Sequence, residues 1–293
     1  MDNFIVLYNP LAGNGTAQDK MCELESLMQG DRLYFSNMLD IRDYGAFFND
    51  MPDGASIIIC GGDGTLNRFL NDTEDIRPDC DIYYYPSGSG NDFARDIGAE
   101  RGAPPVLINR YIVRLPKICV NGKEHRFING IGYGIDGYCC EKGDELRGKG
   151  NGEVNYTAIA IKGLLFHYKP TGATITVDGV EHRFEKVWLA PTMIGRYYGG
   201  GMMPTPEQDR LNGDGAVSVM VYYGSGKLKS LAVFPSIFKG EHIKHSEMVA
   251  VLSGRNITVC FDEPRPLQID GETVPGVREY SVTACEEKVL QPA

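Results

Sequence analysis

The stretch that decides the fold runs Ser56-Ile57-Ile58-Ile59-Cys60-Gly61-Gly62-Asp63-Gly64-Thr65-Leu66-Asn67. Its first five residues form a short, mostly apolar run, which is typical of a strand buried in a parallel sheet. Glycines follow, and the next residues suit a helix. A strand that passes through a glycine-rich turn into a helix is an α/β unit, and such a turn leaves backbone N–H groups free to bind phosphate.

Two further strand-like runs lead into turns of the same kind. Residues 4–8 are followed by a turn that begins with Asn9-Pro10 and contains Gly13 and Gly15. Residues 82–85 lead into Pro86-Ser87-Gly88-Ser89-Gly90-Asn91-Asp92. Parallel strands end at one edge of their sheet, where α/β proteins bind ligands, so we expect the three turns to converge there. We therefore predict an α/β domain over residues 1–108 with a nucleotide-polyphosphate site, although the first turn alone also reads as a simple turn with a helix cap.

The pattern changes after residue 109. Residues 117–128 carry Asn-Gly between two strand-like arms, and residues 174–184 carry Asp-Gly in the same position. Both are strong hairpin signals. We predict a mostly antiparallel β domain over residues 109–282, interrupted by one helix near residues 227–239. The tail, about residues 283–293, could pack back on the first domain.

Composition limits the class of protein. The formal net charge of −10 argues against general binding to nucleic acid or to an anionic membrane, because both repel an acidic protein at long range, so any membrane contact must be local. No apolar run approaches the length of a spanning helix, and the first residues lack the features of a secretory signal. The eight cysteines are scattered and read as reduced thiols. These features predict a cytoplasmic protein without a transmembrane segment.

Asp63 is unexpected in a phosphate-binding turn. A lone carboxylate there would repel the ligand unless a metal ion or a proton intervenes. The sequence therefore favours a chemical role for Asp63 over a purely structural one.

The three turns together resemble the diacylglycerol kinase catalytic-domain family, which includes sphingosine and ceramide kinases. Residues 61–67 match its GGDGTxN motif, and residues 86–95 match its PxGTxNDFAR motif, with Ser89 in place of threonine. Further similarity covers Asp136, the glycines at 199–201, Asp214 and the Asp270-Gly271-Glu272 motif. The resemblance implies a Rossmann-like α/β nucleotide-binding domain followed by a β-sandwich domain, as in NAD kinases and diacylglycerol kinases.

The resemblance also implies an ATP- and Mg²⁺-dependent kinase for a lipid such as diacylglycerol, with the acceptor in a cleft against the β domain. Glu272 would be the general base, although the residues alone favour a hairpin-turn role for it. Asp63 would organise Mg²⁺, and Asp92 and Asp136 would complete the acidic network. The expected nucleotide contacts are Asn9, Gly62, Thr65, Gly88 and Ser89, and the expected ligands of an accessory metal are Asp214, Leu211 and Ala216.

The sequence departs from the family pattern at two positions. Arg68 stands where a glutamate is usual, and Ser218 replaces an aspartate near the accessory metal site. Two other functions therefore stay open: a kinase for a soluble acceptor, and a nucleotide- or lipid-binding sensor without catalysis. Residues 227–239 are basic at the ends and apolar in the middle, so they read as a packed helix or as a surface for peripheral membrane contact. A homodimer is also left open.

Overall fold

The computed structural model describes residues 2–10, 17–76, 78–88, 90–148, 159, 162–163 and 167–285. The chain divides into two compact units, Met1–Val113 and Arg114–Ala293. The boundary at residue 108 and the packing of the tail stay predictions, and residues 286–293 of that tail lie outside the described residues.

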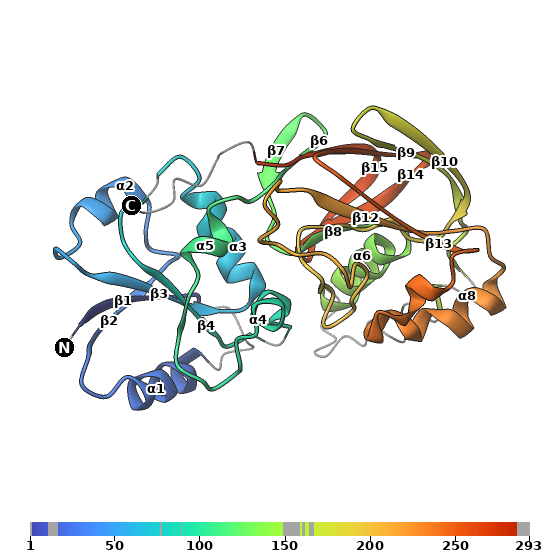
Figure 1. Cartoon of the computed structure of the whole chain (residues 1–293). Helices are drawn as coiled ribbons and strands as arrows, with labels where there is room; N and C mark the ends of the chain where they lie inside the picture. Colours follow the sequence, from blue (N-terminus) through green and yellow to red (C-terminus); the bar gives the residue numbers. More distant parts are fainter. Residues whose placement is uncertain are drawn as a thin grey trace. The chain divides into compact units, whose positions relative to one another are not determined.

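The first unit is an α/β domain, as predicted (Figure 1). Its elements are β1 (Asn3–Tyr8), α1 (Ala17–Leu27), β2 (Arg32–Asn37), α2 (Tyr44–Asn49), β3 (Ser56–Gly61), α3 (Asp63–Asp72), β4 (Ile82–Pro86), α4 (Asp92–Ile97), β5 (Val106–Leu107) and α5 (Asn109–Ile112). The sheet has the order β2-β1-β3-β4-β5. Its first four strands are parallel and β5 is antiparallel, so β1, β3 and β4 all end at one edge.

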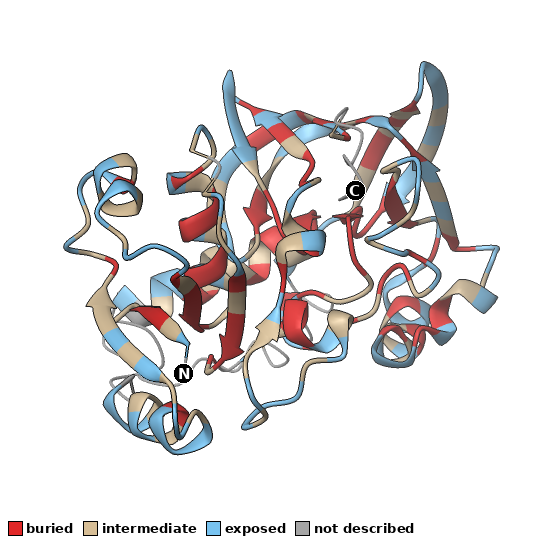
Figure 2. Cartoon of the chain, turned by 60° about the vertical axis from the view of Figure 1, so that its left-hand side comes forward, coloured by how far each residue is buried: buried red, intermediate tan, exposed pale blue. Residues whose placement is uncertain are grey.

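Helices cover both faces of this sheet. Leu24 of α1 is buried against Phe4 of β1 and Ile58 of β3, and α2 and α3 lie on the opposite side from α1 (Figure 1). There the ring of Tyr44 packs edge-on against Phe69, with 5.8 Å between centroids. Buried residues accordingly line the central strands and the inward side of α3 (Figure 2). Burial on both faces explains why these strands are continuously apolar.

The second unit is built around a large antiparallel sheet. Its described elements are β6 (Lys117–Val120), β7 (Lys123–Arg126), β8 (Gly130–Tyr133), α6 (Ile135–Gly148), β9 (Thr171–Val177), β10 (Val180–Val187), β11 (Thr192–Met193), β12 (Val217–Tyr222), α8 (Lys227–Val233), η3 (Phe234–Lys239), η4 (Glu241–Lys244), β13 (Val249–Gly254), β14 (Asn256–Ile269) and β15 (Glu272–Thr283). The main order is β13-β12-β11-β8-β14-β15-β6-β7, and β9 pairs with β10 and β14. The predicted fold class, α/β followed by mostly antiparallel β, is confirmed.

Strand β14 changes partner along its length. Residues 257–261 pair with β9, and residues 267–269 pair with β8. The register against β15 shifts between these two parts, around Pro264 and Pro266. Proline has no N–H to donate to a ladder, so regular pairing is interrupted there and the strand can leave one neighbour for another.

The helices of this unit differ from the prediction at two places. Helix α6, which follows β8, was not predicted. The single helix predicted over residues 227–239 is two elements, α8 and the 3₁₀ helix η3. The break falls at Phe234-Pro235, because proline within a helix removes a backbone hydrogen bond and clashes with the preceding turn.

Candidate functional site

The turn between β3 and α3 is formed almost entirely by backbone. Gly62 is the N-cap of α3, so no side chain caps the first turn of this helix. Gly64 is exposed, and a Cβ added there would meet nothing within 4 Å. Thr65 is only 4 % exposed and packs directly over Gly61. An uncapped helix N-terminus with an open glycine suits an anion such as phosphate.

The turns after β3 and β4 touch through their glycines. A Cβ on Gly88 would lie 2.4 Å from the Cα of Gly62, so neither position can carry a side chain without movement of the backbone. The Ser87 N–H donates to the Gly61 carbonyl at 2.9 Å, and the Asn91 side-chain amide donates to the Gly88 carbonyl at 2.7 Å. Two of the three predicted turns therefore converge at the carboxyl edge of the sheet.

Asp63 joins these two turns. Its Oδ2 accepts the Asp92 N–H at 2.7 Å, and its Oδ1 accepts the Phe93 N–H at 3.1 Å. Those N–H groups lie in the first turn of α4, whose own N-cap residue, Asn91, has a φ of 48° and makes no side-chain cap. Asp63 thus caps a helix that begins 29 residues later. The structure gives Asp63 the structural role that the sequence argument ranked lower; its role with Mg²⁺ stays a prediction.

Asp92 lies beneath the turns and is 4 % exposed. The neighbouring Tyr84 hydroxyl is also buried, and burial together with the Asp63 carboxylate raises the pKa of Tyr84 well above its usual value. The two acids that the sequence assigned to this half of the site are therefore adjacent. Their catalytic roles stay predictions.

The other predicted nucleotide contacts are only partly described. Asn9 follows β1 and is half-buried, whereas Gly13, Gly15 and Ser89 lie outside the described residues. Arg68, the departure from the family pattern, is half exposed and forms an ion pair of 3.4 Å with Asp72, one turn further along α3. A pair of this kind is an ordinary feature of a helix surface.

In the second unit, the Asp270-Gly271 turn joins β14 to β15. Both residues have positive φ, 46° and 96°, as a two-residue hairpin turn requires. The Asp270 carboxylate accepts three backbone N–H groups, from Ile128 at 2.6 Å, Asn129 at 2.9 Å and Gly130 at 3.0 Å. Glu272 is the first residue of β15 and is exposed. Asp270 therefore holds the turn, and Glu272 is presented beside it.

Asp136 lies next to this turn, in the first turn of α6. Its Oδ2 accepts from the Gln268 side-chain amide at 2.9 Å, and the Gln268 oxygen accepts the Gly271 N–H at 2.6 Å. Asp136 keeps some accessible surface, but the protein around its carboxyl group removes water and raises its pKa to about 6. The structure thus links Asp136 to the turn that precedes Glu272. Neither Gln268 nor the three bonds of Asp270 were predicted, because their partners lie far away in the sequence.

Two of the three predicted ligands of an accessory metal, Ala216 and Asp214, already take part in hydrogen bonds. The Ala216 carbonyl already accepts two amide donors, Gln208 Nε2 and Asn212 Nδ2, each at 2.8 Å. Asp214 Oδ1 accepts the Ala216 N–H at 3.2 Å, and the Arg255 guanidinium donates to the Asp214 carbonyl at 3.0 Å. The metal role of Asp214, Leu211 and Ala216 stays a prediction.

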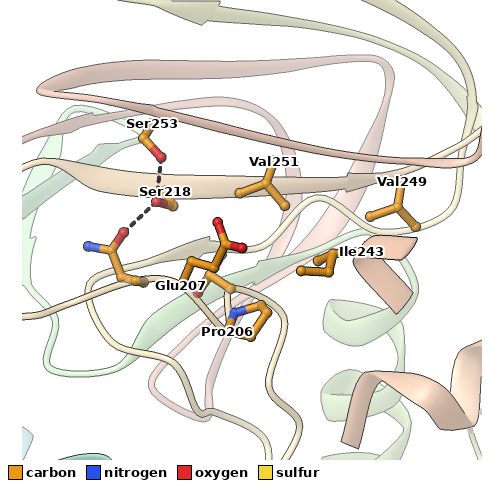
Figure 3. A pocket seen from close by; sticks show the side chains of 9 residues that line it. Pro206, Glu207, Ser218, Ile243, Val249, Val251 and Ser253 are labelled. Carbon is orange, nitrogen blue, oxygen red and sulfur yellow. Dashed lines mark hydrogen bonds between the residues drawn. The ribbon is translucent and has the colours of Figure 1, made fainter. Parts of the chain in front are cut away.

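A cavity of about 450 Å³ lies beside β12 and β13 (Figure 3). Ser218 and Ser253 face one end of it and share a hydrogen bond of 2.7 Å, and Ser218 also bonds to Gln208. Val249, Val251 and Ile243 form the apolar end, with Glu207 between the two ends (Figure 3). Ser218, which replaces the family aspartate, therefore belongs to a polar network on the wall of this cavity. The sequence carried no signal for it.

Comparisons with known proteins match segments of both units to known families. Residues 3–115 match the family described as diacylglycerol kinase catalytic domain, and residues 129–286 match the YegS C-terminal NAD kinase beta sandwich-like domain. The chain is 27 % identical to a diacylglycerol kinase of Mycobacterium tuberculosis H37Rv over 246 residues, which cover 81 % of this chain and 77 % of that one.

Two further similarities extend the comparison. The chain is 29 % identical to a diacylglycerol kinase of Bacillus subtilis strain 168 over 224 residues, covering 74 % of this chain and 70 % of that one. In fold it is similar to a crystal structure of a diacylglycerol kinase from Bacillus anthracis, with a TM-score of 0.63 at 20 % identity, covering 97 % and 94 % of the two chains.

Proposed function

The chain belongs to the diacylglycerol kinase catalytic-domain family, and from this premise we propose that it transfers the γ-phosphoryl group of ATP to a hydroxyl of a lipid such as diacylglycerol. The observation that carries the proposal is the backbone surface where Gly62 meets Gly88 at the uncapped start of α3. The relatives from Mycobacterium tuberculosis and Bacillus subtilis are named diacylglycerol kinases, and this supports a lipid as the acceptor.

The first unit supplies the nucleotide site in this proposal. Gly62 and Gly88 allow phosphate to approach the backbone, and the positive end of α3 favours its negative charge. Asn9, Thr65 and Ser89 are the further proposed nucleotide contacts. Thr65 is almost fully buried and packs over Gly61, so it also helps to fix the shape of the turn.

Asp63 and Asp92 are the residues that would hold Mg²⁺ with the nucleotide. A carboxylate oxygen can accept from more than one partner, so the bonds of Asp63 to the backbone of α4 are compatible with a hard cation, for which carboxylates are suitable ligands. Bound Mg²⁺ supplies positive charge that neutralises the phosphates. Asp63 also holds the first turn of α4 by accepting the Asp92 and Phe93 N–H groups, and this role needs no metal.

The second unit supplies the proton acceptor. Glu272 is exposed at the start of β15 and follows a turn that Asp270 fixes with three backbone bonds, so a substrate hydroxyl can reach its carboxylate. During transfer Glu272 takes the proton of the acceptor hydroxyl while the oxygen forms a bond to phosphorus and the bond to ADP breaks. Asp136, linked to the same turn through Gln268, belongs to this acidic network.

The acceptor is tested by incubating total lipid extract with the protein, ATP and Mg²⁺ and comparing the lipids by mass spectrometry. We expect a lipid species to gain the mass of one phosphate in the presence of the wild-type protein and not with Glu272→Gln. Labelled phosphate that appears on NAD or a sugar in a parallel panel, and not on lipid, would contradict the proposal. Nucleotide binding without transfer to any acceptor would favour a sensor.

A lipid substrate requires contact with a membrane surface, and we propose that α8 and η3 provide it. Leu228 is 79 % exposed and Phe238 is 41 % exposed, and both lie near exposed lysines at positions 227, 229 and 239. In the described part of the chain, no helix is long and apolar enough to cross a membrane. Apolar side chains flanked by lysines suit the interface of an anionic bilayer.

This contact is tested by sedimentation with vesicles of phosphatidylcholine and phosphatidylglycerol. The double variant Leu228→Glu with Phe238→Glu should sediment less than wild type. Val180→Glu is the matched control, since Val180 is 59 % exposed on β10, outside this surface. Equal sedimentation of all three proteins would remove α8 and η3 from membrane contact.

A further inference from the structure

Gln268 connects two parts of the second unit that no other described residue connects in this way. Its side chain is buried, at 3 % exposure, and stands opposite Gly132 in the pairing of β14 with β8. One end donates to Asp136 Oδ2 at 2.9 Å, and the other accepts the Gly271 N–H at 2.6 Å. A single amide thus spans from the start of α6 to the turn before Glu272.

The direction of this amide is determined by its partners. The Gly271 N–H can only donate, so the Gln268 oxygen must face it. The Gln268 NH₂ group then faces Asp136, whose carboxyl oxygen must accept. The alternative orientation would leave a buried N–H facing another N–H, which costs the desolvation of both groups.

Two glycines allow the Asp136 carboxyl and the Gln268 amide to lie close to the backbone. A Cβ on Gly132 would lie 1.5 Å from Asp136 Oδ2 and 2.6 Å from Gln268 Nε2. A Cβ on Gly137 would lie 2.0 Å from the Pro266 carbonyl, so the first turn of α6 rests directly on the backbone of β14. The carboxyl group and the amide therefore sit in a close-fitting site that glycines make available.

The turn is held on both of its sides. Asp270 is bound to the backbone of residues 128–130, and the Gly271 N–H is bound to Gln268. The next residue is Glu272, which pairs with Ile269 across the hairpin. Any rotation of the Gly271 peptide would displace Glu272, and the Gln268 oxygen opposes that rotation.

We propose that Gln268 is a positioning residue for phosphoryl transfer: its amide ties the Gly271 N–H to Asp136 and so determines where the Glu272 carboxylate is presented. The inference rests on the proposed function, in which Glu272 accepts the proton of the acceptor hydroxyl. Gln268 touches neither substrate nor nucleotide in this role. It acts through the turn.

Another contact serves as a built-in control. The Thr273 hydroxyl donates to Asp144 Oδ2 at 2.7 Å, so it also ties β15 to α6, but this bond is exposed and involves neither Asp136 nor the Gly271 N–H. If any tie between these elements sufficed, loss of the Thr273 bond would matter as much as loss of the Gln268 bonds. Thr273→Val removes this tie with little change of shape.

Two substitutions at position 268 differ in which bonds they can keep. Gln268→Met keeps the length of the side chain and removes both bonds, whereas Gln268→Glu keeps an oxygen for the Gly271 N–H and places a second carboxyl group beside Asp136, where the two groups must share a proton. The exchange rate of the Gly271 amide proton, followed by NMR, reports the turn directly and needs no turnover. We expect faster exchange in Gln268→Met, near wild-type exchange in Gln268→Glu, and no change in Thr273→Val.

Turnover is measured with the lipid acceptor, alone and in the Glu272→Gln background. Gln268→Met should lower kcat by about 10- to 100-fold, as a small misplacement of a catalytic group does, with KM for ATP unchanged. In the Glu272→Gln background it should cause no further loss, because there is no carboxylate left to position. Thr273→Val should keep the wild-type kcat.

Three results would overturn the proposal. One is an equal loss of kcat from Gln268→Met in both backgrounds. Another is a wild-type kcat in a Gln268→Met protein whose Gly271 amide exchanges faster. The third is a wild-type protein that transfers phosphate to no lipid while Gly271 protection still depends on Gln268: the proposed function then fails, and the amide is a structural tie only.

Discussion

The turn after β3 and the turn before β15 each contain an aspartate whose carboxylate holds the backbone of a neighbouring segment. Asp63 accepts two N–H groups from the start of α4, and Asp270 accepts three from residues 128–130. The two turns differ in whether one residue or two residues carry the structural role and the proposed catalytic role. In the first unit one residue is both the structural cap and the proposed catalytic acid, whereas in the second Asp270 holds the turn and Glu272 faces the solvent.

In the second unit, different substitutions should therefore lower turnover and lower the free energy of unfolding. In the first unit, substitution of Asp63 should lower both together. A carboxylate bound to backbone N–H groups cannot be removed without leaving those groups unsatisfied. An exposed carboxylate beside the turn can be removed with no such cost.

Glu272→Gln should cause the largest loss. We expect kcat to fall about 10²- to 10⁴-fold, which is the contribution of a general base, with the free energy of unfolding unchanged because the side chain is exposed. Steady-state kinetics and urea unfolding measure the two quantities. Near-normal turnover would remove Glu272 from the mechanism.

Asp270→Ala should instead act on stability. It leaves three backbone N–H groups without their acceptor, and we expect the free energy of unfolding to fall by about 3 kcal/mol or more. Asp270→Asn, which keeps one acceptor oxygen, should lose less. An unchanged urea midpoint for Asp270→Ala would show that the turn does not depend on this carboxylate.

Asp63→Ala should lower both quantities together. Loss of the cap on α4 should reduce the free energy of unfolding by about 1–2 kcal/mol, and turnover should fall because the turns around Gly62 and Gly88 lose their tie. The decisive comparison is with Glu272→Gln, measured by the same two methods. If Asp63→Ala lost turnover without any loss of stability, the two units would not differ as described.

Asp136→Asn tests the pH dependence of the second unit. Burial favours the neutral carboxyl and raises its pKa to about 6, so its contribution to stability is present below the unfolded pKa and is lost as pH rises through about 6. At pH 7 the asparagine variant should therefore be more stable than wild type by on the order of 1 kcal/mol. Urea unfolding between pH 4 and pH 7 should show a smaller slope for the variant, and parallel curves would contradict the assignment.

Arg68→Ala should have the smallest effect. The ion pair with Asp72 is exposed and lies within one helix, so its loss should cost about 0.3–0.5 kcal/mol and leave kcat unchanged. Arg68→Glu is the more informative replacement, since it restores the residue that is usual in the family. A large rise in kcat for Arg68→Glu would show that Arg68 weakens the site, as the sensor alternative requires.

Much of the fold could be predicted because its signals are local. The continuous apolar runs of β1, β3 and β4 indicated buried parallel strands, and Asn121-Gly122 and Asp178-Gly179 indicated hairpins that the structure contains. Helix α6 was missed because it begins with Ile135-Asp136-Gly137, in which Gly137 is a poor helix former and no local signal marks a helix start. The break within residues 227–239 was signalled by Pro235 and was overlooked.

The site divides in the same way. Local sequence was enough to predict the glycine-rich turns and the Asp270-Gly271 turn before Glu272, because glycines and Asp-Gly pairs act on the backbone within a few residues. The hydrogen-bond partners of Asp63 and Asp136 followed only from the fold. Asp63 meets a helix 29 residues away, and Asp136 meets Gln268 across 132 residues, because strand register brings those side chains together and no local preference records it.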